Sequence, residues 1–82
     1  MQLSYDPRRN IAYLRLREPA GVQVETVRLS DEVNIDIAPD ETVYGLELLN
    51  ANAQLLASDG GQFAIIDEAK GRRVEVQLPQ VA

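Results

Sequence analysis

Residues 11–17, Ile-Ala-Tyr-Leu-Arg-Leu-Arg, alternate with a period of two and contain aromatic and branched side chains. This pattern is typical of a β-strand. The stretch lies between two turn-forming segments, Asp6-Pro7-Arg8-Arg9-Asn10 before it and Glu18-Pro19-Ala20-Gly21 after it. Proline fixes φ in such segments, and aspartate, asparagine and glycine suit turn positions. The sequence on both sides is therefore expected to contain further short strands.

Four more strands are predicted by the same criteria. They cover Gln2–Tyr5, Val22–Leu29, Val33–Ile37 and Val43–Leu48. Because the loops between them are short, strands that follow each other in the sequence are expected to pair antiparallel. Residues 1–49 are thus predicted to form an antiparallel five-stranded meander.

The pairing register decides which side chains share a face of this sheet, since a slip of one residue moves every side chain to the other face. Pairing like with like places Arg15 opposite Glu25, Tyr13 opposite Val27, and Ile35 between Val27 and Leu46. The main core face then holds Ile11, Tyr13, Val27, Leu29, Val33, Ile35, Ile37, Tyr44, Leu46 and Leu48. The reverse face is polar at one end and apolar at the other, where it carries Ala12, Leu14, Leu16, Val22 and Val24. This apolar half is expected to need a cover.

The last third of the chain predicts a helix followed by a hairpin. Residues 50–58 have helix-forming composition, with apolar positions 49, 53 and 56 on one face. Asn50 or Asn52 is expected to cap the helix, and Asp59-Gly60-Gly61 to end it. Residues 62–79 predict a β-hairpin whose turn contains Gly71, with a helix over residues 62–70 as the alternative. The 82 residues are therefore expected to form a single domain, mainly β with one short helix.

Composition excludes several kinds of chemistry. The chain has no cysteine and no histidine, which removes disulfides, thiolate nucleophiles, zinc–thiolate sites and the commonest general base. Its formal net charge of −5 disfavours nucleic acid and anionic lipid as partners. No apolar run approaches the roughly 18 residues of a membrane span, and no targeting segment is evident. A soluble cytoplasmic protein without a cofactor is expected.

Four short blocks of the sequence resemble a small bacterial family, known as domain of unknown function 2283. The blocks are Tyr5-Asp6-Pro7, Ala12-Tyr13-Leu14-Arg15-Leu16, Val33-Asn34-Ile35-Asp36-Ile37 and Gly45-Leu46-Glu47-Leu48-Leu49-Asn50-Ala51. The resemblance covers about the first two thirds of the chain and nothing after Ala53. It supports the fold class but implies no activity, and residues 55–82 lie outside it.

Arginines form the first candidate site. The cluster consists of Arg8, Arg9, Arg15 and Arg17, which Arg72 and Arg73 could join. A planar guanidinium suits phosphate and carboxylate recognition, so a small-ligand or phosphate-binding protein is one alternative function. Ion pairing with Glu18, Glu25 or a partner subunit is the preferred interpretation, because a charged edge also prevents unwanted strand pairing.

Carboxylates form the second candidate site. The acidic run consists of Asp31, Glu32, Asp36, Asp40 and Glu41. Calcium and magnesium prefer such oxygen ligands, but the spacing matches no calcium-binding loop, and Asp36 is expected to lie on a strand between two loops. Solvated turn residues are therefore preferred over a metal site.

The preferred function is a non-enzymatic interaction module. No set of residues supplies a tuned base, a nucleophile and an oxyanion site together. A chain of this size rarely leaves the apolar half of a sheet face exposed to water, so a homo-oligomer is expected, with a dimer favoured. The expected interface is the reverse face at Leu14, Leu16, Val22 and Val24, or a sheet edge. Cover by the helix or the C-terminal hairpin of the same chain is the alternative.

Overall fold

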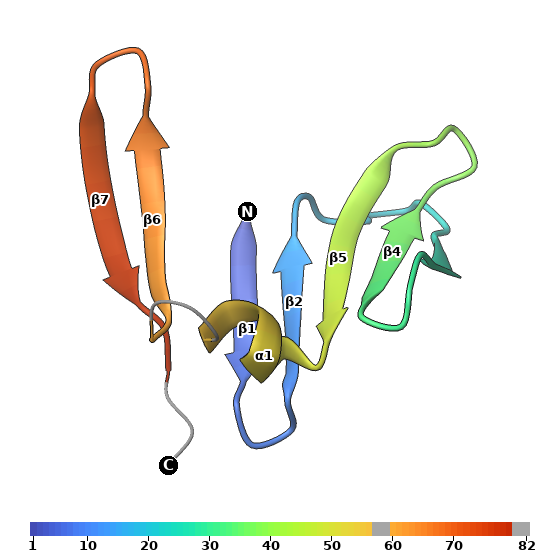
Figure 1. The fold of residues 1–82 in the computed structure, drawn as a ribbon. Coiled ribbons are helices and arrows are strands. Elements are labelled where there is room, and N and C mark those ends of the chain that lie inside the picture. Colours follow the sequence, from blue (N-terminus) through green and yellow to red (C-terminus); the bar gives the residue numbers. More distant parts are fainter. Residues whose placement is uncertain (57–59, 80–82) are drawn as a thin grey trace.

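A computed structural model describes residues 1–56 and 60–79, which form seven strands and one helix (Figure 1). The elements are β1 (Gln2–Asp6), β2 (Ile11–Arg15), β3 (Glu25–Arg28), β4 (Val33–Ile37), β5 (Val43–Leu49), α1 (Ala51–Leu56), β6 (Gln62–Asp67) and β7 (Arg72–Gln77). The predicted fold class is confirmed: the chain is mainly β, with an antiparallel five-stranded sheet, one short helix and a C-terminal hairpin. The predicted helix end at Ser58 and its stop at Asp59 lie outside the described residues.

The order of strands in the sheet is β1-β2-β5-β4-β3, so the sheet is not a sequential meander. β2 pairs with β5 and not with β3, and the predicted pairs of Arg15 with Glu25 and of Tyr13 with Val27 are therefore wrong. Residues 16–24 connect β2 to β3, and they are long enough to carry the chain across the end of the sheet to its far edge (Figure 1). The predicted position of Ile35 between Val27 and Leu46 is confirmed.

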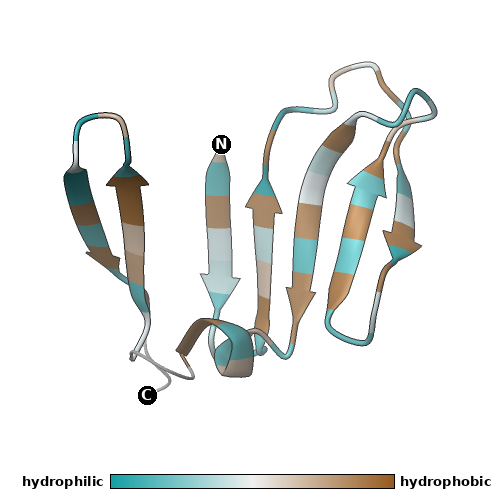
Figure 2. Cartoon of the chain, turned by 45° about the horizontal axis from the view of Figure 1, so that its top comes forward, coloured by the Kyte–Doolittle hydropathy of each residue, from teal (hydrophilic) through white to brown (hydrophobic). Residues whose placement is uncertain are grey.

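With this strand order, each side chain of β2 lies on the face opposite to the one predicted. Leu14 lies opposite Leu46, whereas Tyr13 lies opposite Glu47. The prediction that Ile11 and Tyr13 belong to the main core face is therefore wrong. Ala12 and Leu14 lie on that face instead. Figure 2 shows apolar and polar positions alternating along β4 and β5. Ile11 and Leu49 pair on one face of the sheet, whereas most of its apolar side chains lie on the other face. We call this surface the open sheet face; it consists of Leu3, Leu14, Val27, Val33, Ile35, Ile37, Leu46 and Leu48.

The short helix α1 covers one end of the open sheet face. Ala51 at its start and Ala12 on β2 are only 0% and 1% exposed, because two small side chains allow close packing. Asn50 occupies the N-cap position, where its carbonyl oxygen accepts from the Gln54 amide at 3.3 Å, but the side chain that bonds a first-turn amide is that of Asn10 from the β1–β2 turn. The Asn10 carbonyl oxygen accepts from the Ala51 amide at 3.2 Å, and the Asn10 Oδ1 accepts from the Asn52 amide at 2.8 Å.

Two further bonds fix this junction. Tyr5 Oη donates to Asn52 Oδ1 at 2.6 Å, and Asn52 Nδ2 donates to the Pro7 carbonyl oxygen at 2.9 Å. Asn10 and Asn50 both have positive φ, 59° and 53°, a conformation that asparagine tolerates better than most residues. The turn, the helix and β1 therefore form one hydrogen-bonded unit at this end of the sheet.

Strands β6 and β7 form an amphipathic hairpin. Phe63 pairs with Val76 and Ile65 pairs with Val74, and these four side chains share one face. We call them the hairpin apolar face, and they are 40% to 57% exposed. The opposite face carries Gln62, Ala64, Ile66, Arg73, Glu75 and Gln77. The hairpin stands beyond β1, apart from the sheet, in all three views (Figure 1).

Few side chains are buried within one chain. In the described part of the chain, no large side chain is fully buried, and the buried apolar residues are Ala12, Ala38, Ala51 and Leu78. The accessible surface is 6037 Å², whereas a compact monomer of 9.1 kDa exposes about 4,900 Å². The radius of gyration is 14.4 Å, against about 12 Å for a compact domain of this length. One chain therefore exposes a surplus of about 1,100 Å².

Candidate functional site

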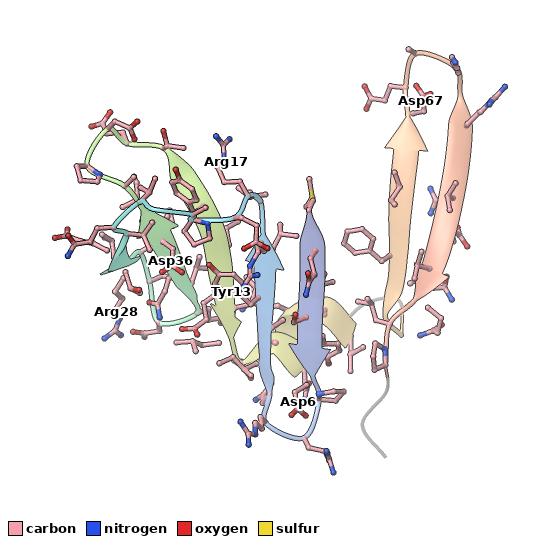
Figure 3. All side chains as sticks on the ribbon, turned by 180° about the vertical axis from the view of Figure 1, so that it is seen from behind. Asp6, Tyr13, Arg17, Arg28, Asp36 and Asp67 are labelled. Carbon is pink, nitrogen blue, oxygen red and sulfur yellow. The ribbon has the colours of Figure 1, made fainter. Side chains whose placement is uncertain are left out.

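The polar face of the sheet, opposite the open sheet face, carries a hydrogen-bonded network centred on Asp36. Tyr13 Oη donates to Asp36 Oδ2 at 2.6 Å, and Thr26 Oγ1 donates to Asp36 Oδ1 at 2.7 Å. These residues come from β2, β4 and β3, and Figure 3 shows Tyr13 and Asp36 on the same face. Both carboxylate oxygens of Asp36 are thus held by hydroxyl donors from other strands.

Gly45 makes the Tyr13–Asp36 contact possible. Gly45 lies opposite Arg15 on β2 and opposite Asp36 on β4, so it separates the two strands that the bond joins. A Cβ atom on Gly45 would overlap the Tyr13 ring and hydroxyl. The absence of a side chain therefore lets the ring lie across β5 and reach the carboxylate.

The network keeps Tyr13 protonated. The hydrogen bond to Asp36 is the main cause that raises the pKa of Tyr13 from 10.0 to about 12, and burial and the charge of Asp36 raise it further. A hydroxyl with this pKa is a hydrogen-bond donor at neutral pH, and it is poorly suited to act as a base or nucleophile. The geometry of the network therefore supports a structural role.

Spectroscopic titration of tyrosine tests this network. We expect one tyrosine to ionise near pH 12, and its pKa to fall in the Asp36→Asn variant, because the amide no longer holds a negative charge beside the hydroxyl. The raised pKa contributes stability that is complete below pH 10 and is lost between about pH 10 and pH 12. Unchanged titration in Asp36→Asn would show that the carboxylate is not the cause.

A shallow hollow lies beside this network. Its volume is about 230 Å³, and it is lined by Ser4, Tyr5, Asp6, Ile11, Ala12, Tyr13 and Glu47. Glu47 is already engaged, because its Oε1 accepts from Asn34 Nδ2 at 2.9 Å. Ligand pockets usually exceed about 300 Å³ and enclose their ligand. The hollow is therefore smaller than an ordinary small-molecule site.

The candidate arginines do not converge. Arg8 and Arg9 lie in the β1–β2 turn, 4.0 and 3.8 Å from the carboxylate of Asp6. Arg15 and Arg17 lie at the other end of β2, as the positions of Asp6 and Arg17 in Figure 3 show. The structure thus divides the four arginines into two pairs at opposite ends of the strand.

Each arginine of the second pair has a partner of its own. Arg15 Nη1 donates to Glu18 Oε1 at 3.1 Å, and the Arg17 guanidinium lies 5.8 Å from the centre of the Tyr44 ring. The two further candidates belong to the hairpin: Arg72 and Arg73 begin β7, where Arg73 Nε is 2.8 Å from Glu75 Oε1. These contacts match the preferred interpretation of the arginines as ion-pairing residues only in part, since Arg17 contacts an aromatic ring.

The acidic run is also dispersed. Asp31 pairs with Arg28, and Asp36 belongs to the tyrosine network. A hydrogen bond from the Thr42 side chain is the main cause that lowers the pKa of the Asp40 carboxyl group, and the Thr42 amide, which donates to Asp40 Oδ1 at 3.0 Å, lowers it further. Within residues 1–56 and 60–79, no three acidic side chains are placed to hold a metal ion. Over the same residues, no helix is long and apolar enough to cross a membrane.

The residues that the sequence predicted for an interface fall into two groups. Leu14 lies on the open sheet face, opposite Leu46 and Leu3, and not on a reverse face. Leu16, Val22 and Val24 lie in the segment between β2 and β3, where Leu16 and Val24 are half-buried and Val22 is exposed. The Leu16 amide donates to the Tyr44 carbonyl oxygen at 2.9 Å, which holds this segment against β5.

A family model described as a protein of unknown function, DUF2283, matches residues 2–52. The chain belongs to the DUF2283 family. The DUF2283 match includes all five strands of the sheet and the first residues of α1, and it leaves out the β6–β7 hairpin. No curated protein and no solved structure matches the chain significantly.

The structure gives the residues of the DUF2283 resemblance a physical role. Tyr13, Asp36 and Gly45 form the network on the polar face, and Tyr5 joins β1 to α1. Sequence reasoning placed Tyr13 in the core and gave Gly45 no role. A glycine inside a strand often marks a close approach, and this signal could have identified Gly45.

Proposed function

We propose that this DUF2283 chain is a non-enzymatic self-association module, and that it forms a homodimer through the open sheet face. One observation carries the proposal: most apolar side chains of the sheet lie on one face, and the described part of the chain covers only one end of that face. Its central residues Leu14, Ile35 and Leu46 are only half-buried. A contiguous apolar surface that the chain covers only in part is typical of protein–protein interfaces.

The size of the exposed surface supports a dimer. A standard interface removes about 800 Å² from each partner, and one chain exposes a surplus of about 1,100 Å² over a compact monomer. A core of this size supplies only about 3–5 kcal/mol without help from disulfides, metals or partners. Disulfides are excluded by the absence of cysteine, so association is the physical means best suited to stabilise the fold.

A catalytic function has little support in the side chains. The chain has no histidine or cysteine, and the Tyr13 hydroxyl has a pKa of about 12. The alternative of a phosphate-binding protein is not favoured either, because Arg8 and Arg9 lie at the opposite end of β2 from Arg15 and Arg17.

Sedimentation velocity over a range from low to high micromolar concentration tests the dimer. We expect a mass of twice 9.1 kDa, with dissociation only on dilution. Raising the salt concentration to about 1 M should leave the dimer intact, because an apolar contact is not screened as ion pairs are. A mass of 9.1 kDa at every concentration would refute the proposal, and dissociation by salt would point to the arginines instead.

A further inference from the structure

We infer that the β6–β7 hairpin of one copy covers the open sheet face of a second copy, so that the dimer forms by reciprocal exchange of hairpins. The inference rests on the proposed dimer and names the surface that each copy contributes. The hairpin apolar face is exposed in one chain, and the open sheet face is half-buried there, apart from Val27, which is 43% exposed. Reciprocal exchange would cover both of them with one type of contact, repeated twice by the twofold symmetry of a dimer.

The hairpin has the shape of a cover for a sheet. Each of its strands has six residues, about 20 Å in length, and the strands of the sheet have four to seven residues. Two sheets pack face to face about 10 Å apart, with side chains from the two inner faces interdigitated. Because α1 occupies only the end of the open sheet face near Ala12, a two-stranded hairpin would have room on the remainder.

Charge favours a hairpin over a second sheet as the cover. Residues 1–56 carry nine acidic and five basic side chains, whereas residues 60–79 carry three of each. Direct packing of two sheets would bring two regions of net negative charge together, and this repulsion acts over a Debye length of about 8 Å in physiological salt. A neutral hairpin brings no such repulsion.

The position of the hairpin points to a second copy and not to its own sheet. The two ends of the hairpin are bonded to each other: Leu78 is only 8% exposed, and its amide donates to the Gly61 carbonyl oxygen at 2.9 Å. Gln77 Nε2 also donates to the Gly60 carbonyl oxygen at 2.9 Å. From these ends the hairpin extends beyond the β1 edge and not over the open sheet face (Figure 1). It is therefore placed to reach a neighbouring molecule.

Adjacent isoleucines in β6 provide a matched test. Ile65 and Ile66 are both 55% exposed in the single chain, but Ile65 belongs to the hairpin apolar face and Ile66 lies opposite Arg73 on the other face. We expect Ile65→Asp to weaken the dimer at least about tenfold, because it places an unpaired charge in an apolar contact, and Ile66→Asp to change it less than about twofold. Equal effects of the two variants would overturn the exchange.

Cross-linking identifies which surfaces meet, and the absence of native cysteine makes every introduced thiol unique. One preparation carries Ile65→Cys and a second, with a different tag, carries Leu14→Cys; the two are mixed, allowed to exchange, and treated with a short bismaleimide. We expect a product that contains one chain of each kind. Replacing the first variant with Ile66→Cys is the control and should give little of this product.

The other outcomes separate the exchange from the proposed dimer. A product formed only between two Leu14→Cys chains would show a dimer of directly packed sheets, which would overturn the exchange and leave the proposed function intact. A double variant that gives only an internally linked single chain would show that the hairpin folds onto its own sheet, which would overturn the exchange. A native protein of 9.1 kDa in sedimentation would refute both.

Discussion

Replacement of Ile35 with aspartate is expected to leave the chain unfolded at micromolar concentration. Ile35 is at the centre of the open sheet face, between Val27 on β3 and Leu46 on β5. In the proposed dimer its side chain is covered, and an unpaired carboxylate there costs several kcal/mol. That is comparable with the roughly 3–5 kcal/mol that a core of this size supplies. Circular dichroism should show loss of β structure.

The same substitution at Ile66 is the control for this experiment. Ile66 is also a strand isoleucine, but it lies on the polar face of the hairpin. Ile66→Asp should keep the circular dichroism and the mass of the native protein, because exposed substitutions usually change stability by less than about 0.5 kcal/mol. If Ile35→Asp were equally folded and kept the native mass, the open sheet face would not be covered and the proposed interface would be wrong.

Replacement of Gly45 with alanine is expected to lower the free energy of unfolding by about 3 kcal/mol. The new methyl group overlaps the Tyr13 ring, and overpacking costs about 1–3 kcal/mol. Displacement of the ring also breaks the hydrogen bond from Tyr13 to the Asp36 carboxylate, and a bond to a charged group contributes about 1.5–3 kcal/mol. Denaturant midpoints measure the loss.

A double-mutant cycle separates this close approach from a general effect of alanine in β5. In the Tyr13→Ala background the ring is absent, so Gly45→Ala should cost much less than it does in the native protein. The difference is the coupling energy between the two positions. A cost for Gly45→Ala that is the same with and without the Tyr13 ring would contradict the role given to the glycine.

The sequence predicted the elements better than their arrangement. The bounds of β4 were predicted correctly and those of β5 to within one residue, because the alternation from Val33 and from Val43 is clear. β2 is different, since both of its faces carry apolar residues: Ile11 and Tyr13 on one, Ala12 and Leu14 on the other. Periodicity alone could not choose between them, and the short-loop rule favoured the wrong neighbour.

The polar network depended on that choice and could not be predicted without it. Tyr13 reaches Asp36 only because β5 lies between β2 and β4, and this order follows from long-range pairing that local patterns do not encode. The arginines illustrate the same difficulty. Arg8 and Arg17 are close in the sequence, but the strand between them places them at opposite ends of the sheet.

The pairing of β2 with β5 also has a consequence for the order of events during folding. It joins residues that are 30 to 38 positions apart, whereas β1–β2 and β3–β4–β5 are built from consecutive segments linked by short turns. Loop closure of this length costs chain entropy before any contact is made, and local hairpins form within about 1–10 microseconds. We therefore expect β1–β2 and β3–β4–β5 to form first, and the β2–β5 ladder, which includes Gly45, to close last.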